Sequence, residues 1–449
     1  MFGTINCCDT YVGTTARINI GDNFQFLALE HIYDTLGLTS HLKEISLKDL
    51  HSYHGESLIV PLNWSIFDSN WMDGNKLSIS PDIKPLFLAV TLGANHKDSY
   101  FNPENIEYLK ANGPIGCRDE VTYRKLLKYD IPCYLNGCLT LTIPARACSG
   151  NFIYFVDTPL SLANKIPHDF LQNARFTSHQ VYYSSKTDPK LIVQNIKKQY
   201  DDYKQNAKLV ITSRLHAAAP CVAMGIPVIF VKEIIDERFS WLDKILPLYS
   251  LSDWDNINWF PAPADIDFIK SKMLECAQKR ILGQETSELQ QEITNFWLDR
   301  PKRHYEDFRK QLFENFDPIF QWLSVSWTPE YLGKYSIWGV TRGAEKLVSL
   351  ISEKYPNSQL CSVVDSYRTE SFLDRKITRP EELLLTKDEK LLVLAAGASP
   401  QARDFMKCGR IDPLNCFLLS DNFITSEEDL LLQKAYVQRY GHEYTSSNG

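Results

Sequence analysis

The stretch Val210-Ile211-Thr212-Ser213-Arg214-Leu215-His216, followed by alanines at 217–219, decides the fold of this chain. Its apolar start is typical of a buried strand. The strand continues directly into a helix, for which Ser213 is the expected N-cap. Other segments carry the same two patterns, with helical spacing at Phe24–Leu36 and Ala344–Lys354. Strand-like apolar runs are predicted at Leu58–Leu62, Leu86–Val90 and Phe152–Val156. Such alternation of short strands and helices is typical of α/β proteins with parallel sheets.

The chain of 449 residues is long enough for about three units. Residues 1–150 and 151–325 are expected to form two Rossmann-like halves around a cleft, the second with a helical extension. Residues 334–449 are expected to form a small Rossmann-like module. Ligands of such sheets bind beyond the carboxyl ends of the strands, so the candidate site residues should lie there.

Composition narrows the function classes. Apolar residues make up 44% and charged residues 23%, as in soluble globular proteins. The net charge of −7, with no basic cluster, argues against nucleic acid as a partner. The 11 cysteines show neither disulfide-framework nor zinc spacing, so a reducing compartment and no metal are expected. Without signal-peptide features or a membrane-spanning apolar run, the sequence predicts a cytoplasmic protein.

Arg214 and His216 fall on the first turn of the predicted helix. Free backbone N–H groups and the helix dipole favour an anion there, and an arginine adds a bidentate partner for carboxylate or phosphate. The dipole lowers the proton affinity of His216 and a bound dianion raises it, which suits a general acid. The alternative is structural: Arg214 pairs with a carboxylate and His216 caps a helix end.

Two further segments are candidates for the same cleft. Arg118 stands at a second strand-to-helix junction, in Gly113–Glu120, where a tight turn with Arg118 paired to a neighbouring acid is the favoured interpretation. In Asn136–Thr142, Thr140 is a candidate pocket hydroxyl, although a plain strand with alternating faces is favoured.

A third candidate segment runs from Asn19 to Gln25. Asp22 and Asn23 precede a helix and either cap it or form a Gly-Asp turn that holds sugar hydroxyls. His179 follows a predicted strand and is equally compatible with a satisfied core histidine.

Together these segments resemble the polysaccharide pyruvyl transferase family. The resemblance covers about residues 3–231 and rests on GPIGCRDE at 113–120, GCLTLT at 137–142, and SRLHAAAP at 213–220 followed by MGIPVIF at 224–230. It implies a GT-B-like fold, in which two Rossmann-like domains face one cleft.

The resemblance also implies the reaction: transfer of the enolpyruvyl group of phosphoenolpyruvate onto two hydroxyls of a sugar, which forms a pyruvate ketal in surface-polysaccharide biosynthesis. Arg118 and Arg214 would hold the phosphate and carboxylate of the donor, the backbone beside Leu215 would add to the anion site, and His216 would be the general acid. No cofactor is required. The expected partners are phosphoenolpyruvate and a sugar or glycan acceptor. A peripheral contact with a lipid-linked glycan is compatible with this, and the sequence specifies no oligomeric state.

A base for the hydroxyl proton is less evident. Asp22, His96 and His179 are candidates of low rank.

The third unit lies outside the resemblance. Gly339 and Gly343 stand where the outer glycines of a dinucleotide turn would be, and Asp365 ends the next strand, where a ribose-binding acid would be. Arg342 between the glycines counts against tight NAD binding. Three roles stay open for this unit: binding of a nucleotide, binding of a nucleotide sugar, or contact with a partner. The same three roles stay open for the turn Gly397-Ala398-Ser399.

Two rival interpretations remain from the sequence. One is a GT-B glycosyltransferase that uses a nucleotide sugar. The other is a non-catalytic binding or scaffold protein whose C-terminal module senses a nucleotide. The pair of arginines, without an evident base or ribose pocket in the second half, favours a small dianionic donor over the first. The intact set of arginines and histidine argues against the second.

Overall fold

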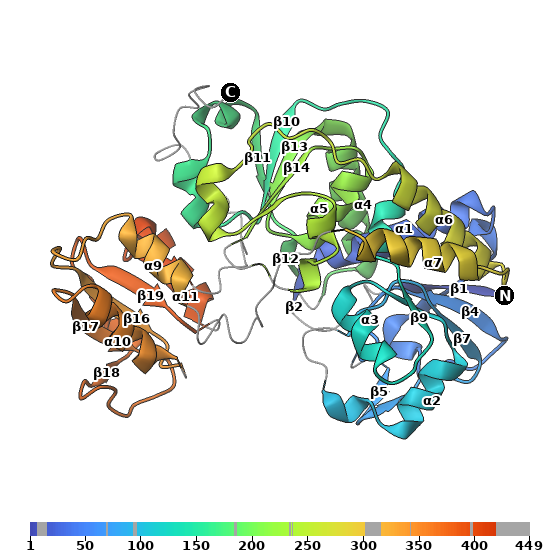
Figure 1. The fold of residues 1–449 in the computed structure, drawn as a ribbon, viewed down its shortest axis with the longest axis horizontal. Coiled ribbons are helices and arrows are strands. Elements are labelled where there is room, and N and C mark those ends of the chain that lie inside the picture. Colours follow the sequence, from blue (N-terminus) through green and yellow to red (C-terminus); the bar gives the residue numbers. More distant parts are fainter. Residues whose placement is uncertain are drawn as a thin grey trace.

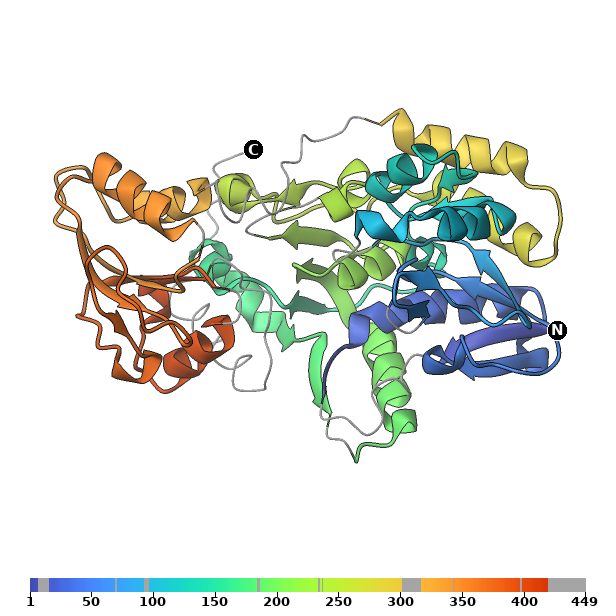
Figure 2. The same cartoon turned by 90° about the horizontal axis from the view of Figure 1, so that it is seen from below.

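The computed structural model describes residues 1–6, 16–68, 71–92, 97–183, 186–232, 235, 237–300, 316–341, 343–395 and 398–418. Within them the chain forms parallel sheets with helices, as the sequence predicts. Figures 1 and 2 show that the unit after residue 316 lies at one end of the molecule, far from the N-terminus. None of the helices in the described ranges is long and apolar enough to cross a membrane.

The first unit is built on a parallel sheet with the strand order β3-β1-β4-β7. A parallel bridge between Val90 and Cys117 adds the pair β8–β9 to its edge. The strands are β1 (Phe2–Asn6), β3 (Leu42–Ser46), β4 (Leu58–Leu62), β7 (Ile83–Phe87), β8 (Ile115–Cys117) and β9 (Cys133–Leu135), with a small hairpin of β5 (Met72–Asp73) and β6 (Lys76–Leu77). The helices are α1 (Phe24–Thr35), α2 (Pro103–Ala111) and α3 (Glu120–Leu127).

The second unit has a five-stranded parallel sheet, in the order β11-β10-β13-β14-β15. Its strands are β10 (Phe152–Val156), β11 (Ala174–Thr177), β13 (Ala207–Thr212), β14 (Val228–Val231) and β15 (Leu248–Tyr249), and its helices are α4 (Pro189–Asn206) and α5 (Leu215–Ala223). In chain order this is 2-1-3-4-5, a doubly wound order whose direction reverses between β10 and β13. The ends of β10 and β13 therefore mark the expected place for a ligand.

The third unit has a five-stranded parallel sheet of its own, in the order β18-β17-β16-β19-β20. Its strands are β16 (Lys334–Trp338), β17 (Gln359–Val364), β18 (Ile377–Thr378), β19 (Lys390–Val393) and β20 (Cys416–Leu418), and its helices are α9 (Asp317–Ser324), α10 (Ala344–Lys354) and α11 (Ser399–Lys407). In chain order this is 3-2-1-4-5, as in dinucleotide-binding folds.

The first two units share one apolar core, whereas the cores of the third unit hold only its own residues. One continuous cluster runs from Ile5 in the first sheet to Val210 in the second and Trp297 after it. The two clusters on the third sheet contain only residues from Phe316 to Leu418. The sequence-based boundary at residue 325 thus falls inside the packing of the third unit, and the domain boundaries remain predictions.

Two features tie the first two units together. β2 (Ala16–Asn19) pairs antiparallel with β12 (Gln180–Tyr183), so a strand of each unit forms one small sheet. After the second sheet the chain returns to the first in α6 (Asp267–Ile281) and α7 (Ser287–Leu298). Arg280 of α6 donates hydrogen bonds to the carbonyls of Phe87 and Pro114, each at 2.7 Å. These helices, which the sequence assigns to the second half, therefore brace the first sheet.

Most elements predicted from sequence appear where they are expected. The predicted β4, β10 and α10 match in their bounds, and Asp119 caps α3 through a hydrogen bond from the backbone N–H of Thr122 at 2.9 Å. The strand predicted at 86–90 is wrong in its bounds, because β7 ends at Phe87.

Candidate active site

A cavity of about 390 Å³ lies between the first two units. The carboxyl ends of β4 and β8 contribute to it from the first sheet, and those of β13 and β14 from the second. Its wall consists of Asn19, Asp22, Gln25, Trp64, Ser65, Thr91, Arg118, His179, Ser213, Arg214, Leu215, His216, Lys232, Arg238 and Phe239. The candidate segments of the first two units thus meet at one cavity, with the exception of 136–142.

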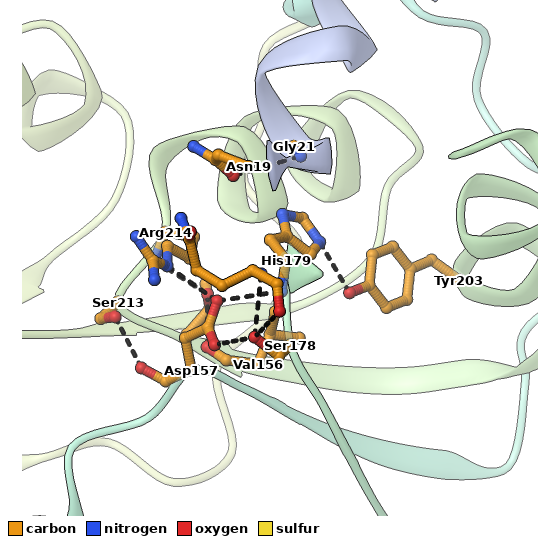
Figure 3. Close-up of polar contacts among 11 residues, drawn as sticks. Asn19, Gly21, Val156, Asp157, Ser178, His179, Tyr203, Ser213 and Arg214 are labelled. Atoms are coloured by element: carbon orange, nitrogen blue, oxygen red, sulfur yellow. Dashed lines mark hydrogen bonds and ion pairs between the residues drawn. The ribbon is translucent and has the colours of Figure 1, made fainter. Parts of the chain in front are cut away.

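Arg214 is held by a buried carboxylate beneath the cavity. Its Nε donates a hydrogen bond of 2.7 Å to Oδ2 of Asp157, the first residue after β10 (Figure 3). Asp157 has a φ of +49°, in the left-handed region, and its carboxylate also accepts from the Ser178 hydroxyl at 2.6 Å. A charge-assisted bond of this kind fixes the direction of the guanidinium. The structural alternative for Arg214 is thereby correct in part, yet Arg214 also lines the cavity.

The predicted N-cap of α5 is wrong. Ser213 does not cap the helix, because its hydroxyl donates to the backbone oxygen of Asp157 at 2.6 Å. The helix begins one residue later, with Arg214 at the N-cap position and Leu215 as the first helical residue. Leu215 and His216 are the first two residues of α5, and the first N–H groups of a helix lack intrahelical acceptors. Leu215 lines the cavity, so that helix start faces the hollow.

Arg118 reaches the cavity from the first sheet and is only 8% exposed. Its Nη1 donates to Oε1 of Gln25 at 3.3 Å, and within the described residues its buried Nε has no hydrogen-bond partner. The predicted pairing with a neighbouring acid is wrong, because Asp119 caps α3 and Glu120 pairs with Lys244. A buried guanidinium with an unused donor is a candidate anion ligand.

His216 is held by an acid from the other unit. Nδ1 of His216 lies 2.8 Å from Oδ1 of Asp22, which stands in a short 3₁₀ turn, Ile20–Asn23, before α1. Burial alone would lower the pKa of His216. The bond to Asp22 and the adjacent thiol of Cys138 outweigh it and raise that pKa to about 8. The imidazole is therefore mainly protonated at neutral pH.

Asp22 remains ionised in this setting. Burial alone would raise its pKa, but the bond to His216 and the charges of His216, Arg118 and Arg214 lower it below the ordinary value. Its side chain is 35% exposed, and it lines the cavity. The predicted Gly-Asp turn facing the cleft is thus present.

His179 lies under the same turn and is fully buried. Its Nε2 is 2.9 Å from the hydroxyl of Tyr203, and its backbone N–H donates to Asp157 at 3.0 Å (Figure 3). Burial lowers the pKa of His179 to about 4, so the ring is neutral at physiological pH. It is a core histidine with one edge at the cavity wall.

Two predicted site residues lie outside the cavity wall. Asn23 is buried and directs its Nδ2 toward the carbonyl of Asn19 at 3.5 Å. The hydroxyl of Thr140 donates to Sγ of Cys138 at 3.1 Å. The strand predicted at 136–142 is also wrong, since Leu139–Thr142 forms a 3₁₀ helix behind His216.

Sequence reasoning missed several residues of the wall. Gln25, Lys232 and Arg238 line the cavity, as does the ring of Trp64. Lys232 had a readable signal, because it directly follows an apolar strand and thus stands at a carboxyl end. Arg238 comes from a 3₁₀ turn, Glu237–Phe239, and carries no such signal.

The glycine turn of the third unit serves packing. Gly339 has a φ of +104°, and a Cβ there would lie 2.5 Å from that of Ala395. The carboxylate of Asp365 accepts from the backbone N–H groups of Val340, Tyr367 and Arg368 at 2.9 to 3.0 Å. Although burial alone would raise its pKa, these bonds lower it. Asp365 therefore organises the loop from within.

Gly343, the second glycine of the predicted turn, precedes α10 as its N-cap residue. Arg342, Gly397 and His96 lie outside the described residues. Among those described, no group of three or more His, Cys, Asp or Glu side chains is arranged to hold a metal ion.

Comparison with known proteins gives one family match, over much of the first two units. Residues 19–233 match the sequence model of the family described as polysaccharide pyruvyl transferase. The match spans every cavity residue up to Lys232 and stops before Arg238 and the third unit. No curated protein matches the chain.

Proposed function

We propose, from the premise that residues 19–233 form a polysaccharide pyruvyl transferase domain, that this protein transfers the enolpyruvyl group of phosphoenolpyruvate to two hydroxyls of one sugar. The products are a cyclic pyruvate ketal and inorganic phosphate. The observation that carries the proposal is the meeting of Arg118, Arg214 and His216 at one cavity, with one arginine from each sheet.

The cavity suits a small polyanion. Five cationic side chains stand in the wall, against the one carboxylate of Asp22 among the described wall residues. They are Arg118, Arg214, Lys232, Arg238 and the protonated His216. Phosphoenolpyruvate carries its carboxylate and its phosphate on the same carbon, C2, which is joined to C3 by the double bond. Two arginines, one from each sheet, would hold both groups and so orient the double bond. Because the cations are already fixed in place, little energy is spent on reorganisation as charge moves during the reaction.

His216 would supply the proton that starts the reaction. With a pKa of about 8 it is charged at neutral pH and can protonate the methylene carbon of the donor. The adjacent carbon then becomes oxocarbenium-like and accepts a hydroxyl oxygen. Loss of phosphate and attack by the second hydroxyl complete the ketal.

The arrangement of the first two units supports a GT-B-like fold, with two parallel sheets whose strand ends face one cavity. GT-B glycosyltransferases share that arrangement, so a nucleotide sugar is the rival ligand.

The nine described cysteines carry free thiols, which supports the proposed cytoplasmic location.

Calorimetric titration of phosphoenolpyruvate tests the proposal without knowledge of the acceptor. Wild type should bind it, and Arg214→Ala should lose binding, because losing a charge-assisted contact costs about 1.5–3 kcal/mol. His216→Ala should retain most of the affinity and lose turnover. Arg175→Ala is the matched control. Arg175 lies in β11 of the second sheet and pairs with Asp202 of α4, outside the cavity wall.

A panel of nucleotide sugars is titrated in parallel. Binding of a nucleotide sugar by wild type, with none of phosphoenolpyruvate, would replace this proposal by glycosyl transfer. Normal turnover by His216→Ala would remove the assignment of His216 as the acid.

A further inference from the structure

His216, the proposed general acid, and Asp22 form one hydrogen-bonded pair that joins the two units. Asp22 and His216 are 194 residues apart in the chain, and their Oδ1 and Nδ1 atoms lie 2.8 Å apart. Asp22 is the only carboxylic acid in the described cavity wall. Among the described wall residues, the candidates for a base that removes a proton from the acceptor are Asp22 and neutral His179.

The geometry separates the roles of the two imidazole nitrogens. Nδ1 of His216 is engaged by Asp22, so a proton given to the donor has to leave from Nε2. Nε2 is buried and has no hydrogen-bond partner within the described residues. Asp22, by contrast, keeps part of its carboxylate exposed to the cavity.

His179 is a poor alternative base. Its Nε2 faces the Tyr203 hydroxyl, and its Nδ1 is buried against Gly21. Burial also disfavours its protonated form strongly.

We propose that Asp22 is the base that takes the proton of the attacking hydroxyl, while Nε2 of its partner His216 gives a proton to the donor. The inference rests on the proposed pyruvyl transfer and adds the acceptor-side group to it.

The protons and electrons balance. The lone pair of the first hydroxyl forms a bond to C2 of the donor, and its proton moves to Asp22, while C3 receives the Nε2 proton of His216. The bond from C2 to the phosphate oxygen then breaks, and its electron pair leaves with the phosphate. The second hydroxyl attacks C2 and gives its proton to that phosphate. Asp22 then releases its proton to solvent water and Nε2 of His216 takes one up, which restores the starting state.

The surroundings of the pair favour this cycle. His216, Arg118 and Arg214 all face Asp22 and keep it ionised before the hydroxyl arrives. The thiol of Cys138 also lies beside His216 and, with Asp22, keeps it charged. Because Asp22 gains one proton as His216 loses one, the net charge of the pair stays unchanged.

The test separates the base from a residue that merely positions His216. Exchange of the C3 hydrogens of phosphoenolpyruvate in D₂O requires only His216, whereas phosphate release also requires a base. Both rates are measured from pH 5 to pH 8 and compared at the pH where each variant exchanges fastest, because removal of Asp22 lowers the pKa of His216. For phosphate release, the acceptor is the methyl hexopyranoside that gives wild type the highest rate. If no sugar gives a higher rate than water does, water is the acceptor.

For Asp22→Ala we expect phosphate release to fall about 100-fold or more, while C3 exchange falls less than tenfold. Added formate should restore phosphate release at least tenfold in Asp22→Ala and leave Asp22→Asn unchanged, because the asparagine fills the space. Asp34→Asn, at the exposed end of α1, is the control.

A parallel fall of exchange and release, with no rescue by formate, would show that Asp22 only positions His216 and would overturn the inference. Failure of the proposed function looks different: wild type itself would then neither bind phosphoenolpyruvate in calorimetry nor exchange its C3 hydrogens.

Discussion

Gly21 packs directly against the imidazole of His179, so closely that a Cβ on Gly21 would lie 2.3 Å from Nδ1 of the ring. The contact joins the turn that carries Asp22 to the strand end that carries Asp157. Next to it, the backbone N–H of Ile20 donates to the carbonyl of His179 at 2.8 Å. The distance between Asp22 and the second sheet is therefore set by the absence of a side chain at residue 21.

Gly21→Ala should lower turnover much more than it lowers stability. The new methyl group has to push either the turn or the buried ring, and either shift moves Asp22 away from His216. We expect a loss of turnover of tenfold or more, measured as phosphate release. Adding His179→Ala makes room for the methyl group, so the double variant should be more active than Gly21→Ala alone. Equal activity of the two would mean that the contact is not what matters.

Asp157→Asn should weaken donor binding without unfolding the protein. Asparagine tolerates the left-handed backbone of this position, so the φ of +49° adds no strain. It exchanges a charged acceptor for a neutral one beneath Arg214 and frees the guanidinium to turn. We expect the dissociation constant for phosphoenolpyruvate to rise about tenfold, which is about 1.4 kcal/mol. Calorimetry measures this, and an unchanged constant in a folded variant would argue that Arg214 is oriented by other contacts.

Sequence patterns predicted local structure well where the cause is local. The helix α10 and the strand β10 match in their bounds because apolar periodicity and flanking breakers determine them. Placing Arg118, Arg214 and Lys232 at one cavity needs only the rule that ligands bind at the carboxyl ends of parallel strands. Lys232 follows from that rule and was still overlooked.

Other features of the site depend on distant pairings. The partner of Arg214 is Asp157, 57 residues away, and that of His216 is Asp22, 194 residues away. No local pattern identifies either pair. The first depends on the pairing of β10 with β13 in the second sheet, and the second depends on how the β2–β12 strands join the two units. The helix start at Leu215 was missed for a similar reason, since a backbone carbonyl of another strand engages the Ser213 hydroxyl.

Protonation of His179 should make the protein sensitive to acid. Its pKa falls from 6.5 to about 4 on folding, so the unfolded chain binds a proton between these values that the folded chain does not. Stability contributed by the neutral ring is complete above pH 6.5 and is lost as the pH falls toward 4, by up to roughly 3 kcal/mol. Urea unfolding of wild type and His179→Phe at pH 7 and pH 5 measures this. The loss on acidification should be smaller in the variant, and an equal loss would assign the acid sensitivity to other groups.

Deletion of the third unit should leave the first two units folded, provided that the truncation removes the whole apolar core of the third unit, from Phe316 onward. Phe316, Leu323 and Trp327 pack only within the cluster of the third sheet, although they precede its first strand. A chain that ends at residue 300 keeps α6, α7 and the whole cavity wall, so it should fold and bind phosphoenolpyruvate as the full chain does. A chain that ends at residue 333 keeps these apolar side chains without their sheet and should bind a hydrophobic dye and aggregate. Calorimetry and light scattering compare the two. Unfolding of the shorter chain would show that the third unit contributes to the stability of the other two.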